Sequence, residues 1–197
     1  MISLDIEASG TNYEKHSIVS IGAVDLDEPL RQFYMECRIW EGAHIMDGAL
    51  AVNGFTEAEI NDPQKLTEAE IVEQFLEWTM QANDRTLVGQ NVSFDRDFVR
   101  AACERAHVAY DLPYRTIDTH TLCYMHMVTR ALTPPFDAQH KRSALDLDVI
   151  LNYCGIPEEP HPHNALTGAK CHAEVASRLL YDKKLLPEFA QYDIPWE

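Results

Sequence analysis

The 197-residue sequence predicts an α/β (α+β) domain: a mixed sheet that begins with an antiparallel meander and is flanked by helices. Two features of the pattern favour this class. The first 40 residues contain three strand-like segments joined by short connections, and after residue 60 helical spacing alternates with short apolar runs. The composition, 46% hydrophobic and 24% charged, is that of a globular chain and excludes wholesale disorder.

Three strands are predicted at the start of the chain. Residues 1–7 alternate in polarity, residues 17–24 are apolar enough for a buried strand, and residues 31–40 combine alternation with aromatic side chains. Gly10 and Asn12 mark a turn between the first two. The short connections predict that the strands pair as an antiparallel meander.

Helices and strands alternate in the rest of the chain. Thr67 and Glu70 form a capping-box pattern ahead of a helical run that reaches Trp78. The further elements expected are strands over 86–90 and 115–118, helices over 94–108, 119–132, 143–154 (capped by Ser143) and 165–180, and a loop over 134–142. We expect one domain over residues 1–182 and a C-terminal tail over 183–197.

Charge and cysteine content narrow the function classes. The chain has 16 basic and 32 acidic residues, a net charge of −16, which argues against a protein that coats nucleic acid. An enzyme that grips a few phosphates at a metal site stays open, because divalent cations supply the positive charge there. The five cysteines form no C-x-x-C pair, and no apolar run approaches the ~20 residues of a membrane span. We therefore expect a cytoplasmic protein with reduced thiols and no membrane partner.

Three short motifs carry side chains that suit hydrolytic chemistry. Asp5 and Glu7 project from the same face of the first strand and would attract a hard divalent cation, unless that face is simply wet. Asp95 lies where a strand gives way to a helix, either as a site residue or as a first-turn acid that suits the helix dipole. His163 precedes the last helix, as a general base or as a surface histidine.

In this order, the motifs resemble those of the DEDDh family of 3′→5′ exonucleases, the proofreading-subunit and RNase T superfamily on a ribonuclease-H-like fold. The first motif is Asp5-Ile6-Glu7, the second is N-x-x-F-D over residues 91–95, and the third, H-x-A-x-x-D, begins at His163. The resemblance covers roughly residues 1–181.

The resemblance implies two-metal hydrolysis of phosphodiester bonds, with release of nucleoside 5′-monophosphates. Asp5, Glu7 and Asp95 would hold two Mg²⁺ or Mn²⁺ ions, and His163 would take a proton from the attacking water. The implied partner is a single-stranded 3′ end of DNA or RNA, while a protein partner or a homo-oligomer stays open. Residues expected at the substrate are Ala8, Ser9, Asn91 and Phe94, with Arg96, Lys141 and Arg142 as phosphate contacts or solvated surface residues.

One position departs from the family pattern. The fourth acidic residue, expected five places after His163, is Gly168. Either Gly168 permits close packing and activity is lost, or His172, one helical turn further on, reaches back to ligate metal. The first alternative predicts a catalytically impaired domain that binds nucleic acid or protein. A hydrolase acting on a small phosphorylated substrate is a third hypothesis.

Overall fold

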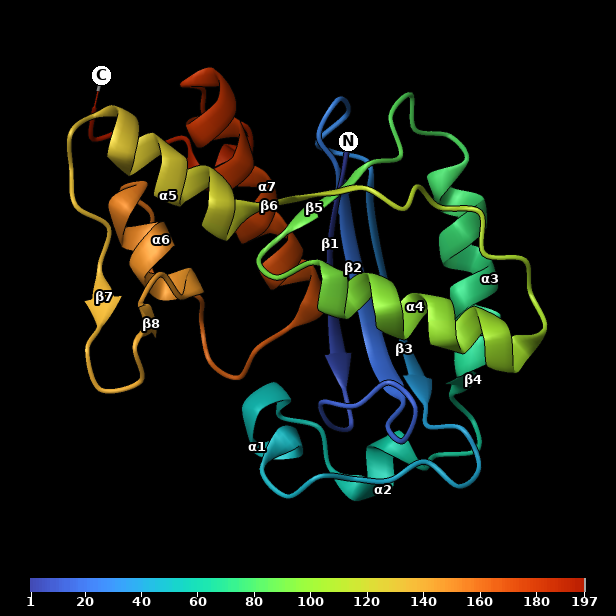
Figure 1. The fold of residues 1–197 in the computed structure, drawn as a ribbon. Helices are drawn as coiled ribbons and strands as arrows, with labels where there is room; N and C mark the ends of the chain where they lie inside the picture. The colour runs from blue at the N-terminus through green and yellow to red at the C-terminus, as the bar shows by residue number, and fades with distance from the viewer. Residues whose placement is uncertain (197) are drawn as a thin grey trace.

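A six-stranded mixed sheet forms the centre of the protein, whose computed structural model describes residues 1–196 (Figure 1). The strand order is β4-β3-β2-β1-β5-β6. The bounds are β1 (Ile2–Ala8), β2 (Ile18–Asp25), β3 (Gln32–Arg38), β4 (Leu66–Thr67), β5 (Leu87–Gly89) and β6 (Thr116–Asp118). Strands β1 to β3 pair antiparallel, and β5 and β6 run parallel to β1. The predicted fold class is confirmed, including the meander at the start.

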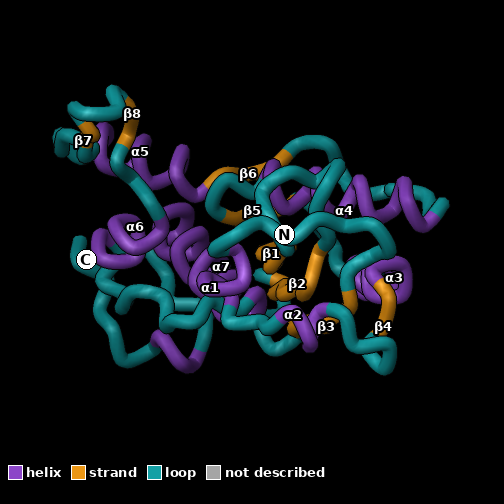
Figure 2. Tube along the Cα trace, turned by 90° about the horizontal axis from the view of Figure 1, so that it is seen from below, coloured by secondary structure: helices purple, strands orange, loops and turns teal. Residues whose placement is uncertain are grey.

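Helices cover both faces of this sheet (Figure 1). The larger core lies between the sheet and α3 and α4, and a second core lies between the sheet and α7. Helices α5 and α6 pack on the outer side of α7, and the short helices α1 and α2 lie beyond the carboxyl end of β1 (Figure 2). The bounds are α1 (Ala49–Asn53), α2 (Glu57–Ile60), α3 (Glu68–Thr79), α4 (Ser93–Ala106), α5 (Thr119–Thr129), α6 (Leu147–Tyr153), α7 (Ala165–Tyr181) and η1 (Pro187–Phe189).

The capping box predicted ahead of α3 is present. Thr67 Oγ1 accepts a hydrogen bond from the Glu70 main-chain N–H at 3.2 Å, and Glu70 Oε2 accepts one from the Thr67 N–H at 2.7 Å. Both donors would otherwise lack a partner within the helix, so the sequence sets the start of α3 locally.

The cap predicted for α6 was wrong. The helix begins at Leu147, and Asp146 caps it by accepting a hydrogen bond from Val149 N–H at 3.0 Å. Ser143 instead lies in β8 (Arg142–Ser143), which pairs with β7 (Phe136–Asp137), so the stretch expected as a loop contains a small hairpin. The Ser143 hydroxyl is within 2.9 Å of His120 Nε2, a long-range contact that the local pattern does not contain.

Two glycines let α7 lie close to the sheet. A Cβ on Gly22 of β2 would overlap the main chain of Ala165, and a Cβ on Gly168 would overlap the carboxylate of Asp5 on β1. Ser3 Oγ also donates a hydrogen bond to the Ala169 carbonyl at 2.7 Å. The N-terminal half of α7 is thereby held directly over the strand that carries the first acidic motif.

Residues 183–196, most of the stretch expected as a tail, pack back onto α7. Arg178 is fully buried and is paired with Glu174, with Nε 2.8 Å from Oε1. The remaining Arg178 nitrogens donate to the carbonyls of Cys154, Asp193, Phe189 and Tyr192. Residue 197 lies outside the described residues.

The part of the chain that the structure describes contains no helix long and apolar enough to cross a membrane. All five cysteines are free and buried there.

Candidate active site

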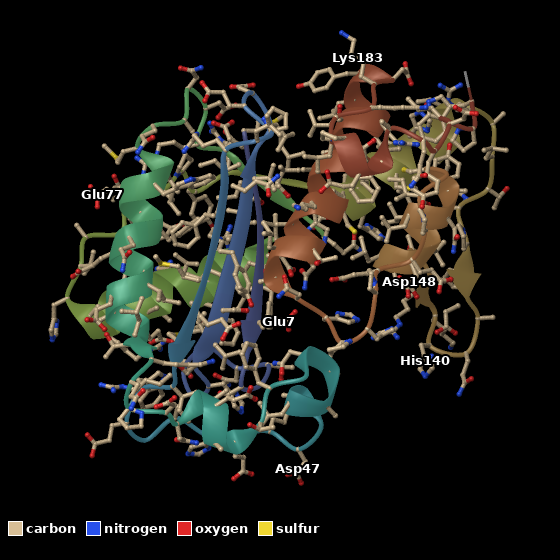
Figure 3. All side chains as sticks on the ribbon, turned by 180° about the vertical axis from the view of Figure 1, so that it is seen from behind. Glu7, Asp47, Glu77, His140, Asp148 and Lys183 are labelled. Carbon is tan, nitrogen blue, oxygen red and sulfur yellow. The ribbon has the colours of Figure 1, made fainter. Side chains whose placement is uncertain are left out.

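Three acidic side chains predicted as site residues meet at the centre of the sheet. Asp5 and Glu7 lie on one face of β1, as the strand period requires. Asp95, in the first turn of α4, is 4% exposed, and its Oδ1 accepts a hydrogen bond from the main-chain N–H of Ile6 at 3.0 Å. Asp95 is therefore fixed to β1 at the residue between the other two acids. Figure 3 shows Glu7 close to the start of α7.

The carboxylates of this cluster have raised pKa values, because they are buried and lie close to one another. Burial, and after it the charges of Asp95, Glu7 and Glu159, raises the pKa of Asp5 well above its ordinary value. Burial and then Glu159 raise the pKa of Glu7 to about 7. The pKa of Asp95 is also raised, chiefly by burial, although the hydrogen bond from Ile6 opposes this. Such strongly perturbed groups in one place are typical of functional sites.

Glu159 is a fourth acid that the sequence analysis missed. It lies in the loop between α6 and α7, is 6% exposed, and has its Oε2 3.6 Å from Nδ1 of His163. Within residues 1–196, its Oε1 has no hydrogen-bond partner. Its neighbour Glu158 is exposed, and in sequence the two look alike, a pair of acids between prolines. The only signal in the sequence is that this pair of acids lies shortly before the third motif.

His163 lies beside Glu159, in the loop that leads into α7. Its side chain is about one-third exposed, and its main-chain N–H donates to the Val52 carbonyl at 3.0 Å, which ties the loop to α1. Burial, together with the nearby His161, lowers the pKa of His163 below 6.5. The imidazole is therefore neutral near pH 7 and has a nitrogen free to accept a proton.

The donor set fits a hard divalent cation in its chemistry. Asp5, Glu7, Asp95 and Glu159 offer carboxylate oxygens, the ligands that Mg²⁺ and Mn²⁺ prefer. One of these oxygens, Oε1 of Glu159, is buried without a partner. Across the described residues, no group of three or more His, Cys, Asp or Glu side chains is arranged as it stands to hold a metal ion. The acids are thus near neighbours that repel one another, as expected for carboxylates without a counter-charge.

His172, proposed from the sequence as a stand-in ligand, lies on the sheet side of α7. It is 2% exposed, and its Nδ1 would be 3.1 Å from a Cβ placed on Gly89 of β5. Burial lowers the pKa of His172 to about 4, against a smaller opposing effect of the Leu4 carbonyl. Its Nδ1 has no hydrogen-bond partner among the described residues, and the space beside Gly168 is taken by Asp5.

A mostly apolar pocket of about 250 Å³ adjoins the acids. Glu7, Ala8 and Phe94 are among its lining residues, together with residues of α1 and the loop before it. The Ala8 carbonyl accepts a hydrogen bond from Asn53 Nδ2 at 3.2 Å.

The other residues expected at the substrate are placed differently. The hydroxyl of Ser9 is buried and donates to the His44 carbonyl at 2.8 Å, so its visible role is to hold the turn. Asn91 is exposed, with a φ of 51°, in the turn that leads into α4. Arg96 pairs with Asp97, whereas Arg142 lies on the β7–β8 hairpin, which projects away from the sheet (Figure 2).

Comparison with known proteins assigns the class that this fold and site suggest. The family model described as RNase_T, Exonuclease, matches residues 2–176, and the chain belongs to this family. Its activity is the 3′→5′ exonucleolytic hydrolysis of nucleic acids, and the family in general depends on two divalent metal ions.

Similar proteins span most of the chain. Ribonuclease T of Klebsiella pneumoniae is 27% identical over 168 aligned positions, covering 73% of this chain and 77% of that protein, and Ribonuclease T of Escherichia coli K12 is 26% identical with the same coverage.

Among solved structures, the nuclease domain of 3′hExo, a DEDDh family member bound to rAMP, matches with a TM-score of 0.70 at 18% identity. The match covers 94% of this chain and 93% of the 3′hExo chain. E. coli Exonuclease I in complex with a dT13 oligonucleotide has a TM-score of 0.70 at 16% identity. It covers 93% of this chain, which spans 41% of that protein. These two likenesses support the ribonuclease-H-like fold.

Proposed function

We propose that this protein removes nucleotides from the 3′ end of a single-stranded nucleic acid, with Asp5, Glu7 and Asp95 as metal-binding carboxylates and His163 as the base. The observation that carries the proposal is the meeting of these acids beside an apolar pocket, with the partly exposed His163 next to Glu159. A nuclease needs these parts: negative ligands for cations, a surface for a base or sugar, and a proton acceptor.

The protein groups have distinct tasks in this reaction. Two divalent ions, Mg²⁺ or Mn²⁺, would supply the positive charge that stabilises the attacked phosphate and the leaving oxygen. Asp95, held by the Ile6 N–H, keeps one carboxylate fixed against β1. His163 accepts a proton from the attacking water through its neutral imidazole, and its partial exposure lets that proton pass to solvent.

The pocket beside Glu7 suits the terminal nucleotide. Phe94 offers a ring on which a base can stack, and such stacking is worth about 1–3 kcal/mol per base whatever its identity. The chain carries a net charge of −16, so strand binding would depend on this stacking and on the bound cations rather than on a basic surface. The curated relatives are named Ribonuclease T, which makes RNA the first substrate to test.

The impaired-domain alternative has one supporting observation, the glycine at position 168. A 5′-labelled single-stranded RNA and its DNA counterpart, each incubated with the protein and Mg²⁺ or Mn²⁺, distinguish the two. We expect a ladder of products shortened from the 3′ end and its loss in EDTA. Asp95→Asn keeps the hydrogen bond from Ile6 but removes the charge, and should reduce cleavage by at least about 100-fold. Binding without cleavage by the wild type would favour the impaired domain.

A further inference from the structure

The site lacks room for the family's fourth acid at its usual place. Gly168 is buried, and a Cβ built there would overlap Oδ2 of Asp5 and lie 2.8 Å from its Cγ. Any side chain at position 168 would require the Asp5 carboxylate to move. The helix can therefore approach β1 as closely as it does only because this residue is glycine, and that approach leaves α7 without an acid for the cluster.

A different segment brings an acid to the same cluster. Glu159 belongs to the loop that enters α7, nine residues before Gly168, and its side chain is 6% exposed. The charge of Glu159 raises the pKa of both Asp5 and Glu7, so Glu159 is within electrostatic range of these two acids. The adjacent Glu158 is exposed and accepts a hydrogen bond from Asn152, so this loop sends one of two identical side chains outward and the other inward.

Among the described residues, no Lys or Arg pairs with the buried carboxylate of Glu159, and the main-chain N–H of Asn164 stabilises its charged form. Its Oε1 lacks any partner among the described residues, and its Oε2 is 3.6 Å from Nδ1 of His163, too long for a good hydrogen bond. Burial raises the pKa of Glu159 to about 7 even with the Asn164 N–H opposing it, so the charged form is disfavoured unless a cation meets it. The charge of Glu159 acts on Asp5 and Glu7, and Asp148 acts on Glu159, so the charged neighbours of this carboxylate are themselves acids.

We propose that Glu159 replaces the missing fourth acid as a metal ligand, supplied by the loop before α7 instead of by the helix. The proposal rests on the proposed function, because it assigns a ligand to the same metal site. It accounts together for the overlap at Gly168 and for the buried, unpartnered Oε1. With Glu159 as the fourth acid, His172 is not needed as a ligand.

Mn²⁺ titration of the full chain by calorimetry tests this proposal without relying on activity. Wild type, Glu159→Gln and the matched control Glu158→Gln are compared after metal removal with EDTA and dialysis. We expect Glu159→Gln to bind Mn²⁺ at least about 10-fold more weakly and to lose most of the thermal stabilisation that Mn²⁺ gives the wild type. Glu158→Gln should match the wild type in both measurements.

Two further variants test whether Glu159→Gln simply misfolds and whether Glu159 acts only through His163. Glu159→Asp keeps the charge one methylene further away, and its Mn²⁺ affinity should lie between those of the wild type and Glu159→Gln. If Glu159 acted only by positioning His163, His163→Ala would weaken Mn²⁺ binding as much as Glu159→Gln, or neither would weaken it. Either result would overturn the proposal.

The two levels of the hypothesis fail differently. Unchanged Mn²⁺ affinity in Glu159→Gln, with cleavage by the wild type intact, removes Glu159 from the ligand set and leaves the proposed function standing. A wild type that binds Mn²⁺ through Glu159 but cleaves no oligonucleotide contradicts the proposed function and leaves the ligand assignment standing.

Discussion

Replacing Glu7 by glutamine is expected to stabilise the metal-free protein at alkaline pH. Burial, and then the charge of Glu159, raises the pKa of Glu7 from 4.5 to about 7. Above pH 7 the folded protein therefore carries a charge that is better solvated in the unfolded chain. Since one pKa unit corresponds to about 1.4 kcal/mol, the free energy of unfolding is lowered by about 3 kcal/mol through this residue.

The pH dependence follows from proton binding. Between pH 4.5 and pH 7, the folded protein holds a proton on Glu7 that the unfolded chain has released. Stability must then fall as the pH rises through this window, and the cost is fully present above pH 7. Below pH 4.5 both states are protonated, and the cost vanishes. Glutamine does not titrate, so the advantage of the variant should grow from below about 1 kcal/mol at pH 5 to about 1–3 kcal/mol at pH 8.

Urea unfolding in EDTA at pH 5 and pH 8 measures this difference. For a chain of this length, a gain of 1–3 kcal/mol raises the thermal midpoint by about 3–10 °C. Glu14→Gln is the matched control, because Glu14 is an exposed acid away from the cluster. An equal gain in Glu14→Gln would assign the effect to the net charge of −16. A Glu7→Gln variant less stable than the wild type at pH 8 would refute the reasoning.

Three further changes test other parts of the structure. His163→Ala should lower the cleavage rate by about 10²–10⁴ and remove the fall in rate below about pH 6.5, because burial and His161 lower the pKa of this base; an unchanged pH profile would place the base elsewhere. Phe94→Ala should raise KM about 10-fold with little change in kcat, measured on a short oligonucleotide, since it removes a wall of the pocket; a fall in kcat alone would contradict this role. Arg178→Met should lower the free energy of unfolding, measured in urea, by about 3–5 kcal/mol, because it leaves Glu174 buried and unpaired. The control Lys170→Met removes a partly exposed ion pair and should lower it by under about 1 kcal/mol.

Local rules of the chain were enough to predict much of the fold and part of the site. The period of a strand puts Asp5 and Glu7 on one face wherever β1 lies in the molecule. The capping box at Thr67 closes within four residues, so its pattern needs no tertiary context. The order and spacing of the three motifs along the chain indicated the family, because the order of the strands and helices fixes the order in which the acids follow one another.

Long-range packing decided the features that local patterns could not contain. Glu158 and Glu159 are the same residue type in the same loop, and only the position of that loop against β1 buries one and exposes the other. The meaning of Gly168 likewise depends on how closely α7 approaches the Asp5 carboxylate. Ser143 was a reasonable helix cap by its residue type, but the β7–β8 hairpin and Asp146 compete for that stretch of chain. Burial and contact distance are properties of two segments at once, so the sequence by itself determined which residues bear charge, and the tertiary structure decided which of those charges meet.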